Sequence, residues 1–209
     1  MGTPEVATAQ LAVITRGFTQ KDAFNAINYG LVLRNRSIAL TAIDVSVTVT
    51  FSSRSDAQVA TDEETITEVP PGCYFDVGGN AFSAISLAPA HMRVSLKVAG
   101  STVQQMPLPT ATARIQNVLP FAELTGEVHN PYRVPLPSGA TIYMVYLNPR
   151  GKVLGGDNET TGAMITPGAT VPFTDQLLSA ISGPAVVRVS VDPDGFPTPG
   201  SGEVRWVPA

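Results

Sequence analysis

The chain has 209 residues, 14% of them charged, and a formal net charge of -4 at pH 7. With 13 Lys and Arg against 17 Asp and Glu, and no basic cluster, it lacks the positive face that nucleic-acid binding requires, so we expect no nucleic-acid partner. Its positive mean hydropathy excludes the polar regime of disordered chains, and no run approaches the roughly 20 apolar residues that span a bilayer. We therefore expect a folded chain that does not insert directly into a membrane.

Alternating apolar residues predict strands throughout the first half of the chain. Apolar side chains occupy every second position from Ile27 to Leu33, and the segment ends at Asn35, whose short polar side chain suits a turn. The clearest strand is 43–51, where Ile, Val and Phe alternate with Asp, Ser and Thr. One face of that strand should be buried and the other should face water. The segment 93–98 shows the same alternation.

Helix signals are nearly absent. Gly and Pro each number 18, and β-branched residues fill most of the remaining runs. Only 82–87 and 177–182 could each form one helical turn. Many short strands separated by Pro, Gly, Asn and Asp, without crossover helices, favour antiparallel β-sandwiches over parallel sheets.

The second half of the chain repeats the first. The features shared by the halves are an asparagine, an aromatic residue, a Pro-Gly pair and an arginine that begins a polar/apolar alternation. In the first half these are Asn35, Phe51, Pro71, Gly72 and Arg93, and in the second they are Asn130, Tyr146, Pro167, Gly168 and Arg188. A period near 100 residues suits a duplicated globular domain. We therefore predict an all-β chain of two tandem immunoglobulin-like antiparallel β-sandwich domains, 1–106 and 107–209, with a proline-stiffened boundary near Met106–Thr110.

The second half also carries a family resemblance. It contains Gly126-Glu-Val-His-Asn130, then an aromatic strand and a Gly151-Lys152 turn, then Pro167-Gly168 and Phe173. This pattern resembles the FxLYD domain, a bacterial immunoglobulin-like sandwich. The first half matches less closely, because residues 52–55 replace the Gly-Lys turn. The resemblance implies a binding or spacer role at the cell surface and no catalytic residues or cofactor.

Few side chains are candidates for chemistry. His91 and His129 are the only histidines, and neither has Cys, Asp or Glu at metal-ligand spacing. We therefore assign them surface or cross-strand roles. No Gly-x-Ser-x-Gly occurs, although a site assembled from distant segments stays open as an alternative. Cys73 follows the alternation of Phe75 and Val77, so we expect it to be a small core residue and not a nucleophile.

Carboxylate-rich segments stand at equivalent places in both halves. They are 62–64 and 157–159, and they could supply oxygen ligands to calcium or form solvated hairpin edges. We favour the hairpin edges. A third acidic segment, Asp192–Gly195, has the composition of a turn.

The halves differ most on one face of the long strand. Thr48, Thr50 and Ser52 in the first half correspond to Tyr143, Val145 and Leu147 in the second. This apolar face is either buried within the chain or presented to a partner. The hypothetical protein-binding residues are accordingly Tyr143, Val145 and Leu147.

These features favour a non-enzymatic, extracytoplasmic protein-binding or spacer module without cofactors or metals. Its partner would be another protein, or a second copy of this chain, at a strand edge or the apolar sheet face. A surface rich in Thr, Ser, Val, Ala and Gly is typical of exported bacterial β-modules, and a tether or signal segment could have been removed. The alternatives are a structural subunit of an envelope or filament assembly, a hydrolase with a dispersed site, and a cytosolic protein that begins at Met1.

Overall fold

The computed structural model describes residues 8–22, 24–103, 107–118, 121–177 and 186–193. These residues form twelve strands and no helix. The described part of the chain therefore has no helix that could cross a membrane. The strands of the first half are β1 (Leu11–Phe18), β2 (Ala26–Asn35), β3 (Thr41–Ser52), β4 (Gln58–Val69), β5 (Tyr74–Phe82) and β6 (His91–Thr102). Those of the second half are β7 (Thr110–Val118), β8 (Phe121–His129), β9 (Thr141–Leu147), β10 (Val153–Thr160), β11 (Thr170–Leu177) and β12 (Val186–Asp192).

The strands form four three-stranded antiparallel sheets, two in each half. The first half, here called the first copy, contains the sheets β1-β2-β5 and β4-β3-β6. The second copy contains β11-β8-β7 and β10-β9-β12, which is the same order with every strand number raised by six. The predicted all-β sandwich class is therefore confirmed, and each sheet takes all its strands from one half of the chain.

The buried asparagines of the repeat have matching hydrogen bonds. Asn35 Nδ2 donates to the carbonyl oxygens of Leu40 and Val69, and Asn130 Nδ2 donates to those of Val134 and Ile165. The carbonyl of each asparagine also accepts the backbone N–H of the glycine in the Pro-Gly pair. Gly72 and Gly168 have φ angles of 73° and 70°, a left-handed conformation that favours glycine. The likeness of the halves is therefore structural as well as sequential.

We expect Asn130→Ala to destabilise the chain by about 2 to 4 kcal/mol, because Asn130 is fully buried and the change leaves buried carbonyl groups without a donor. The measurement is urea unfolding. Asn148→Ala is the matched control, since the side chain of Asn148 binds only the backbone N–H groups of an exposed turn, and should cost about 1 kcal/mol. Equal losses for the two variants would contradict this account of the buried asparagine.

Alternation along β3 produces the core of the first copy. Val45, Val47, Val49 and Phe51 are fully buried, whereas the residues between them are partly exposed. Phe51 packs against Phe18, with ring centroids 5.4 Å apart. The second copy has its own cluster of buried residues, which includes Leu124, Leu136, Ile142 and Met144 among others. Each copy thus closes around an apolar interior.

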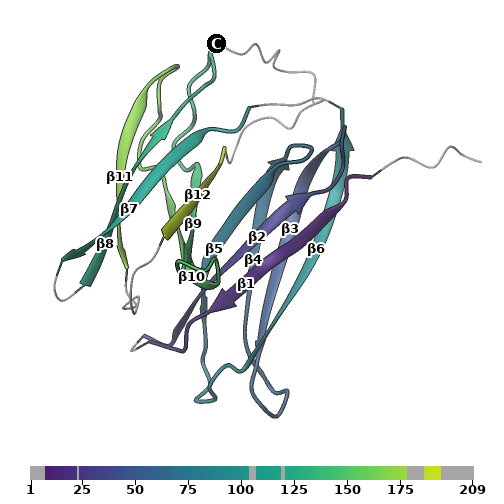
Figure 1. Cartoon of the computed structure of the whole chain (residues 1–209), viewed down its shortest axis with the longest axis vertical. Helices are drawn as coiled ribbons and strands as arrows, with labels where there is room; N and C mark the ends of the chain where they lie inside the picture. The colour runs from purple at the N-terminus through teal and green to yellow at the C-terminus, as the bar shows by residue number, and fades with distance from the viewer. Residues whose placement is uncertain (1–7, 23, 104–106, 119–120, 178–185, 194–209) are drawn as a thin grey trace, which may run out of the picture.

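The two copies pack against each other face to face (Figure 1). The sheet β1-β2-β5 of the first copy lies against the sheet β10-β9-β12 of the second, with β10 crossing over β1, β2 and β5. We call these two the inner sheets and the surface between the two copies the junction, to which β4 also contributes. The sheets β4-β3-β6 and β11-β8-β7 are the outer sheets. The molecule is therefore a stack of four sheets, in which both inner sheets are covered on both sides.

Two local predictions are wrong and a third is untested. The helical turn predicted for 82–87 is not formed, because residue 82 ends β5 and residues 84–86 form bends. The corresponding prediction for 177–182 falls largely outside the described residues. Cys73 is exposed, not a core residue, because the left-handed turn at Gly72 interrupts the alternation just before β5 begins.

Candidate functional site

The predicted protein-binding residues lie at the junction. Tyr143, Val145 and Leu147 are 1%, 0% and 8% exposed, so they are not available to a partner protein. Val145 and Leu147 pack with Val32 of the first copy and with Val153. The hypothesis of an exposed patch is therefore wrong, and burial within the chain, the other interpretation of this face, is the observed arrangement. The physical reason is that the first copy supplies the apolar surface that covers this face.

Three glycines allow the inner sheets to approach closely. Gly17, Gly30 and Gly78 stand opposite one another on β1, β2 and β5, and so form a row across the inner sheet of the first copy. A methyl group at Gly17 would lie 2.3 Å from the carbonyl oxygen of Val153. At Gly78 it would lie 2.1 Å from that of Met144. Any larger side chain in this glycine row would force the sheets apart.

The second copy meets the glycine row with glycines of its own. Gly155 and Gly156 lie on β10, and the Gly155 carbonyl oxygen would be 2.5 Å from a methyl group at Gly30. Strand-interior glycines often mark a site where another backbone approaches. The pairs Gly78-Gly79 and Gly155-Gly156 were therefore a signal in the sequence that could have located the junction.

Hydrogen bonds and one ion pair also cross the junction. Arg188 Nε lies 3.1 Å from both carboxylate oxygens of Asp76, and Ser190 Oγ accepts the Asp76 backbone N–H at 2.9 Å. Asn80 donates to Asp157, and Asn158 Nδ2 donates to Glu64 Oε1 at 2.7 Å. The Tyr143 hydroxyl donates to Glu64 and to the Thr65 carbonyl. The Thr67 N–H donates to the Asp192 carboxylate. These contacts fix the relative position of the two copies.

The two carboxylate-rich segments are parts of strands and not loops. Residues 62–64 lie in β4 and 157–159 in β10. Burial, with repulsion from Asp62 as a second cause, raises the pKa of Glu64 to about 7. Burial also raises the pKa of Asp157 to about 6. Both strands are edge strands of hairpins, β3-β4 and β9-β10, as predicted, but neither segment is wholly solvated. The described part of the chain holds no group of three or more His, Cys, Asp or Glu placed to bind a metal.

The histidines have the roles expected from their strand positions. His91 is exposed at the start of β6. The His129 ring lies 3.1 Å from Thr170 Oγ1 of the neighbouring strand β11, which is a cross-strand contact. Asp192 ends β12, and the rest of the predicted 192–195 turn falls mostly outside the described residues.

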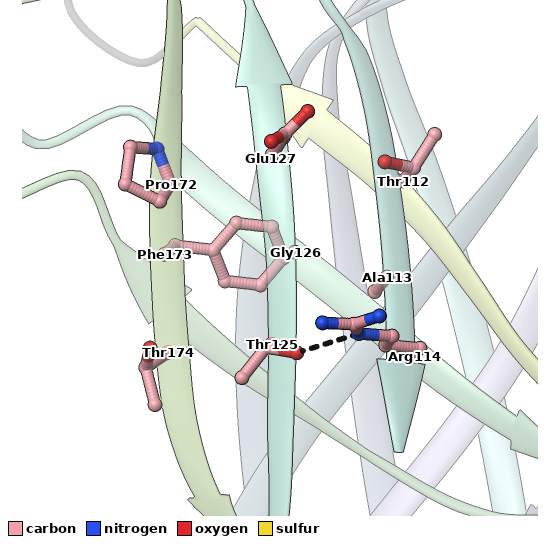
Figure 2. A pocket seen from close by; sticks show the side chains of 9 residues that line it. All are labelled: Thr112, Ala113, Arg114, Thr125, Gly126, Glu127, Pro172, Phe173 and Thr174. Carbon is pink, nitrogen blue, oxygen red and sulfur yellow. Dashed lines mark hydrogen bonds between the residues drawn. The ribbon is translucent and has the colours of Figure 1, made fainter. Parts of the chain in front are cut away.

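A shallow groove crosses the outer sheet of the second copy (Figure 2). Its volume is about 530 Å³, and nine residues of β7, β8 and β11 line it. The Phe173 ring lies over Gly126, where no Cβ could fit, and Arg114 Nε donates to Thr125 Oγ1 at 3.3 Å. None of the nine lining residues is a histidine or cysteine. The groove therefore lacks the histidine that serves as the base in the Ser–His and Cys–His pairs of acyl transfer.

The first copy exposes several large apolar side chains at one end. Phe24, Phe82, Ile85 and Leu87 are 66%, 68%, 40% and 42% exposed, and we call them the apolar tip. The loops that carry them are tied together by the following bonds: Ser83 N–H to the Asn25 carbonyl at 3.1 Å, Gln20 Nε2 to the Pro89 carbonyl at 3.3 Å, and Lys21 Nζ to the Ile85 carbonyl. The tip is thus an ordered surface that no part of the described chain covers.

No protein-family model matches the chain, and no curated protein matches it. Among solved structures, the chain is similar to red sea bream transglutaminase, with 12% sequence identity and a TM-score of 0.31. That match covers 90% of this chain and 29% of the transglutaminase chain. A likeness at this level carries no argument about function. The resemblance to the FxLYD domain stays a prediction.

Proposed function

We propose that this chain is a non-enzymatic tandem immunoglobulin-like module that acts outside the cytoplasm as a rigid protein-binding unit. The observation that carries the proposal is the apolar tip, where Phe24, in the β1–β2 connection, and Phe82, the last residue of β5, are about two-thirds exposed. Hydrogen bonds hold together the two loops at this end. Ordered, solvent-exposed apolar groups of this size are typical of protein interaction sites. The apolar tip replaces the buried residues Tyr143, Val145 and Leu147 as the proposed binding surface. The proposed extracytoplasmic location depends on the amino-acid composition alone.

The junction supports a rigid unit and not two jointed domains. Domains that move relative to each other usually share small, polar interfaces. Here the backbones of the inner sheets touch through glycines, and a core tyrosine of the second copy, Tyr143, packs within the core cluster of the first. A rigid base holds the apolar tip in a fixed direction, which lowers the entropy lost when a partner binds.

The outer faces support a single module over a filament subunit. The two copies contact each other through non-equivalent sheets, β1-β2-β5 of the first and β10-β9-β12 of the second. A contact between non-equivalent surfaces can in principle repeat and add further copies in an open stack. In the second copy, however, the positions equivalent to the glycine row are Arg114, Thr125 and Thr174, which also stand opposite one another in register. These side chains would prevent the close backbone contact that the junction uses, so stacking by the same contact ends after two copies.

Among the described residues, the lack of a suitable site weighs against a hydrolase. The two histidines lie on strands of different copies, and the groove of Figure 2 contains neither. General-base catalysis near neutral pH most often uses histidine. The proposed function therefore assigns no catalytic role to any residue.

The test is a double substitution in the apolar tip, Phe24→Ser with Phe82→Ser. We expect the wild-type chain to capture a partner from the envelope fraction of its source organism, and the double variant to bind the purified partner at least about tenfold more weakly, because two anchor side chains are lost. Thermal unfolding should change by less than about 2 °C, since both side chains are largely exposed. Affinity is measured by calorimetry.

Ile38→Ser is the matched control, because Ile38 is 98% exposed in the β2–β3 connection, at the other end of the first copy. It should leave partner binding unchanged. Equal binding by the wild type and the tip variant would refute the role of the tip. A large fall in the stability of the tip variant would show that these side chains serve folding instead.

A further inference from the structure

A pair of carboxyl groups is buried where β4 of the first copy meets the second copy. Glu68 is 0% exposed, and neither Oε1 nor Oε2 has a hydrogen-bond donor among the described residues. A carboxylate buried without donors is among the costliest groups to ionise in a protein interior. Glu68 therefore needs either a neutralising partner or a proton.

The group that approaches Glu68 from the second copy is another carboxylate. Asp192, at the end of β12, is 1% exposed, and its oxygens accept the N–H of Thr67 at 3.0 and 3.1 Å. This bond places Asp192 beside the residue that precedes Glu68. Tyr132, from the β8–β9 connection, is 3% exposed. Burial raises the pKa of its hydroxyl, and the charges of Glu68 and Asp192 raise that pKa further. Two acids and one phenol thus share a buried space between the copies.

The other charged groups on the neighbouring strands are engaged or exposed. Asp76 of β5 and Arg188 of β12 bind each other. Glu64, on the same strand as Glu68, binds Tyr143 and Asn158, and Asp44 of β3 is exposed. Because two neighbouring buried carboxylates cannot both ionise cheaply, one of them should keep a proton.

We propose that Glu68 holds a proton when the two copies are docked, because Asp192 brings a second carboxylate to the same buried space, and that loss of this proton in alkaline solution loosens the junction. The proton on Glu68 removes one of the two negative charges from this buried space, and it comes from solvent and returns to solvent. The pair is then a pH-sensitive latch that joins β4 to β12.

The sign of the effect follows from the direction of the shift. Burial, and secondly the charge of Asp192, raise the pKa of Glu68 from 4.5 to about 8. The docked state therefore binds a proton that the unfolded chain releases above pH 4.5. The stabilisation is complete below pH 4.5 and is lost as pH rises through about 8. This junction should be tightest in acid and weakest in alkaline solution.

The direct test is an NMR titration of side-chain carboxyl carbons in the wild-type chain, after treatment with EDTA. We expect the Glu68 signal, assigned by its absence in Glu68→Gln, to titrate with a midpoint near pH 8. In Asp192→Asn the midpoint should move to lower pH, because the neighbouring charge is gone. A Glu68 midpoint below pH 6 in the wild type would overturn the proposal, and this measurement does not depend on the folding of any variant.

The functional test compares melting temperatures between pH 7 and pH 9.5. The wild type should lose about 3 to 6 °C more than Glu68→Gln, which carries no titrating group at this place. Glu63→Gln, an exposed residue of the same strand, should behave as the wild type. Equal pH dependence of the wild type and Glu68→Gln would refute the latch. A second result would also refute it. If 1 mM calcium raised the melting temperature of the wild type but not that of Glu68→Gln, a cation and not a proton would stabilise the pair of carboxyl groups.

Discussion

Gly78→Ala should separate the two copies or unfold the chain, at a cost of about 3 kcal/mol or more. A methyl group at this position would lie 2.1 Å from the carbonyl oxygen of Met144 and 2.3 Å from that of Asp157. Both atoms belong to backbones held in the hydrogen-bonded pairing of β9 with β10, so neither can move as a side chain could. Relief requires a shift of one inner sheet against the other, and overpacking of this kind is strongly destabilising.

The measurement is urea unfolding together with hydrogen exchange at two amides that cross the junction. The N–H groups of Thr67 and Asp76 donate to Asp192 and Ser190 of the second copy, so they should lose protection first. Gly100→Ala is the matched control, because a methyl group at Gly100 would meet only Ile43 Cβ, at 3.9 Å, and should change stability by less than about 1 kcal/mol. If both variants kept protected amides at Thr67 and Asp76, close backbone contact would not be what sets the junction.

The sequence predicted the content of each copy well, because local physics determines it. Alternation in 43–51 fixes which side of β3 is buried, and the pairs Asn35 with Gly72 and Asn130 with Gly168 fix the same turn in each copy. These features act within one sandwich. They are visible in a single sequence because the side-chain period and the turn chemistry leave few other arrangements.

The arrangement of the copies was only half visible in the sequence. The difference between Thr48 and Tyr143 showed that one face of the second copy needed a cover, but it could not show which surface supplied it. That answer depends on the glycine row, whose members are 13 and 48 residues apart along the chain (Gly17 to Gly30, Gly30 to Gly78) and become neighbours only through strand register. The apolar tip was likewise missed, since Phe82 was assigned to a possible helical turn at 82–87, whereas in the structure it is the exposed last residue of β5.

Tyr143→Ala should destabilise the chain by about 3 to 5 kcal/mol, as expected when a fully buried aromatic side chain is truncated. Tyr143 is 1% exposed, and its ring lies at 67° to that of Phe75, with centroids 5.9 Å apart. Its hydroxyl lies 3.1 Å from Glu64 Oε2, so the substitution leaves a cavity and removes a donor from a half-buried carboxylate. The measurement is urea unfolding at pH 6, where part of the Glu64 population is charged.

Tyr143→Phe separates the contribution of the ring from that of the hydroxyl. It should cost only about 1 kcal/mol, because packing against Phe75 is kept and only the hydroxyl, with its contacts to Glu64 and Thr65, is lost. The hydrogen bond from this hydroxyl lowers the pKa of Glu64 against the opposing effect of burial, so in the Phe variant Glu64 should titrate above the value of about 7. Because a carboxyl group with a raised pKa stabilises the folded chain in its protonated form, the Phe variant should gain more stability than the wild type as pH falls from 8 to 6. A loss below about 1 kcal/mol for Tyr143→Ala would mean that the second copy does not insert this side chain into the first, and the junction of the four-sheet stack would have to lie elsewhere.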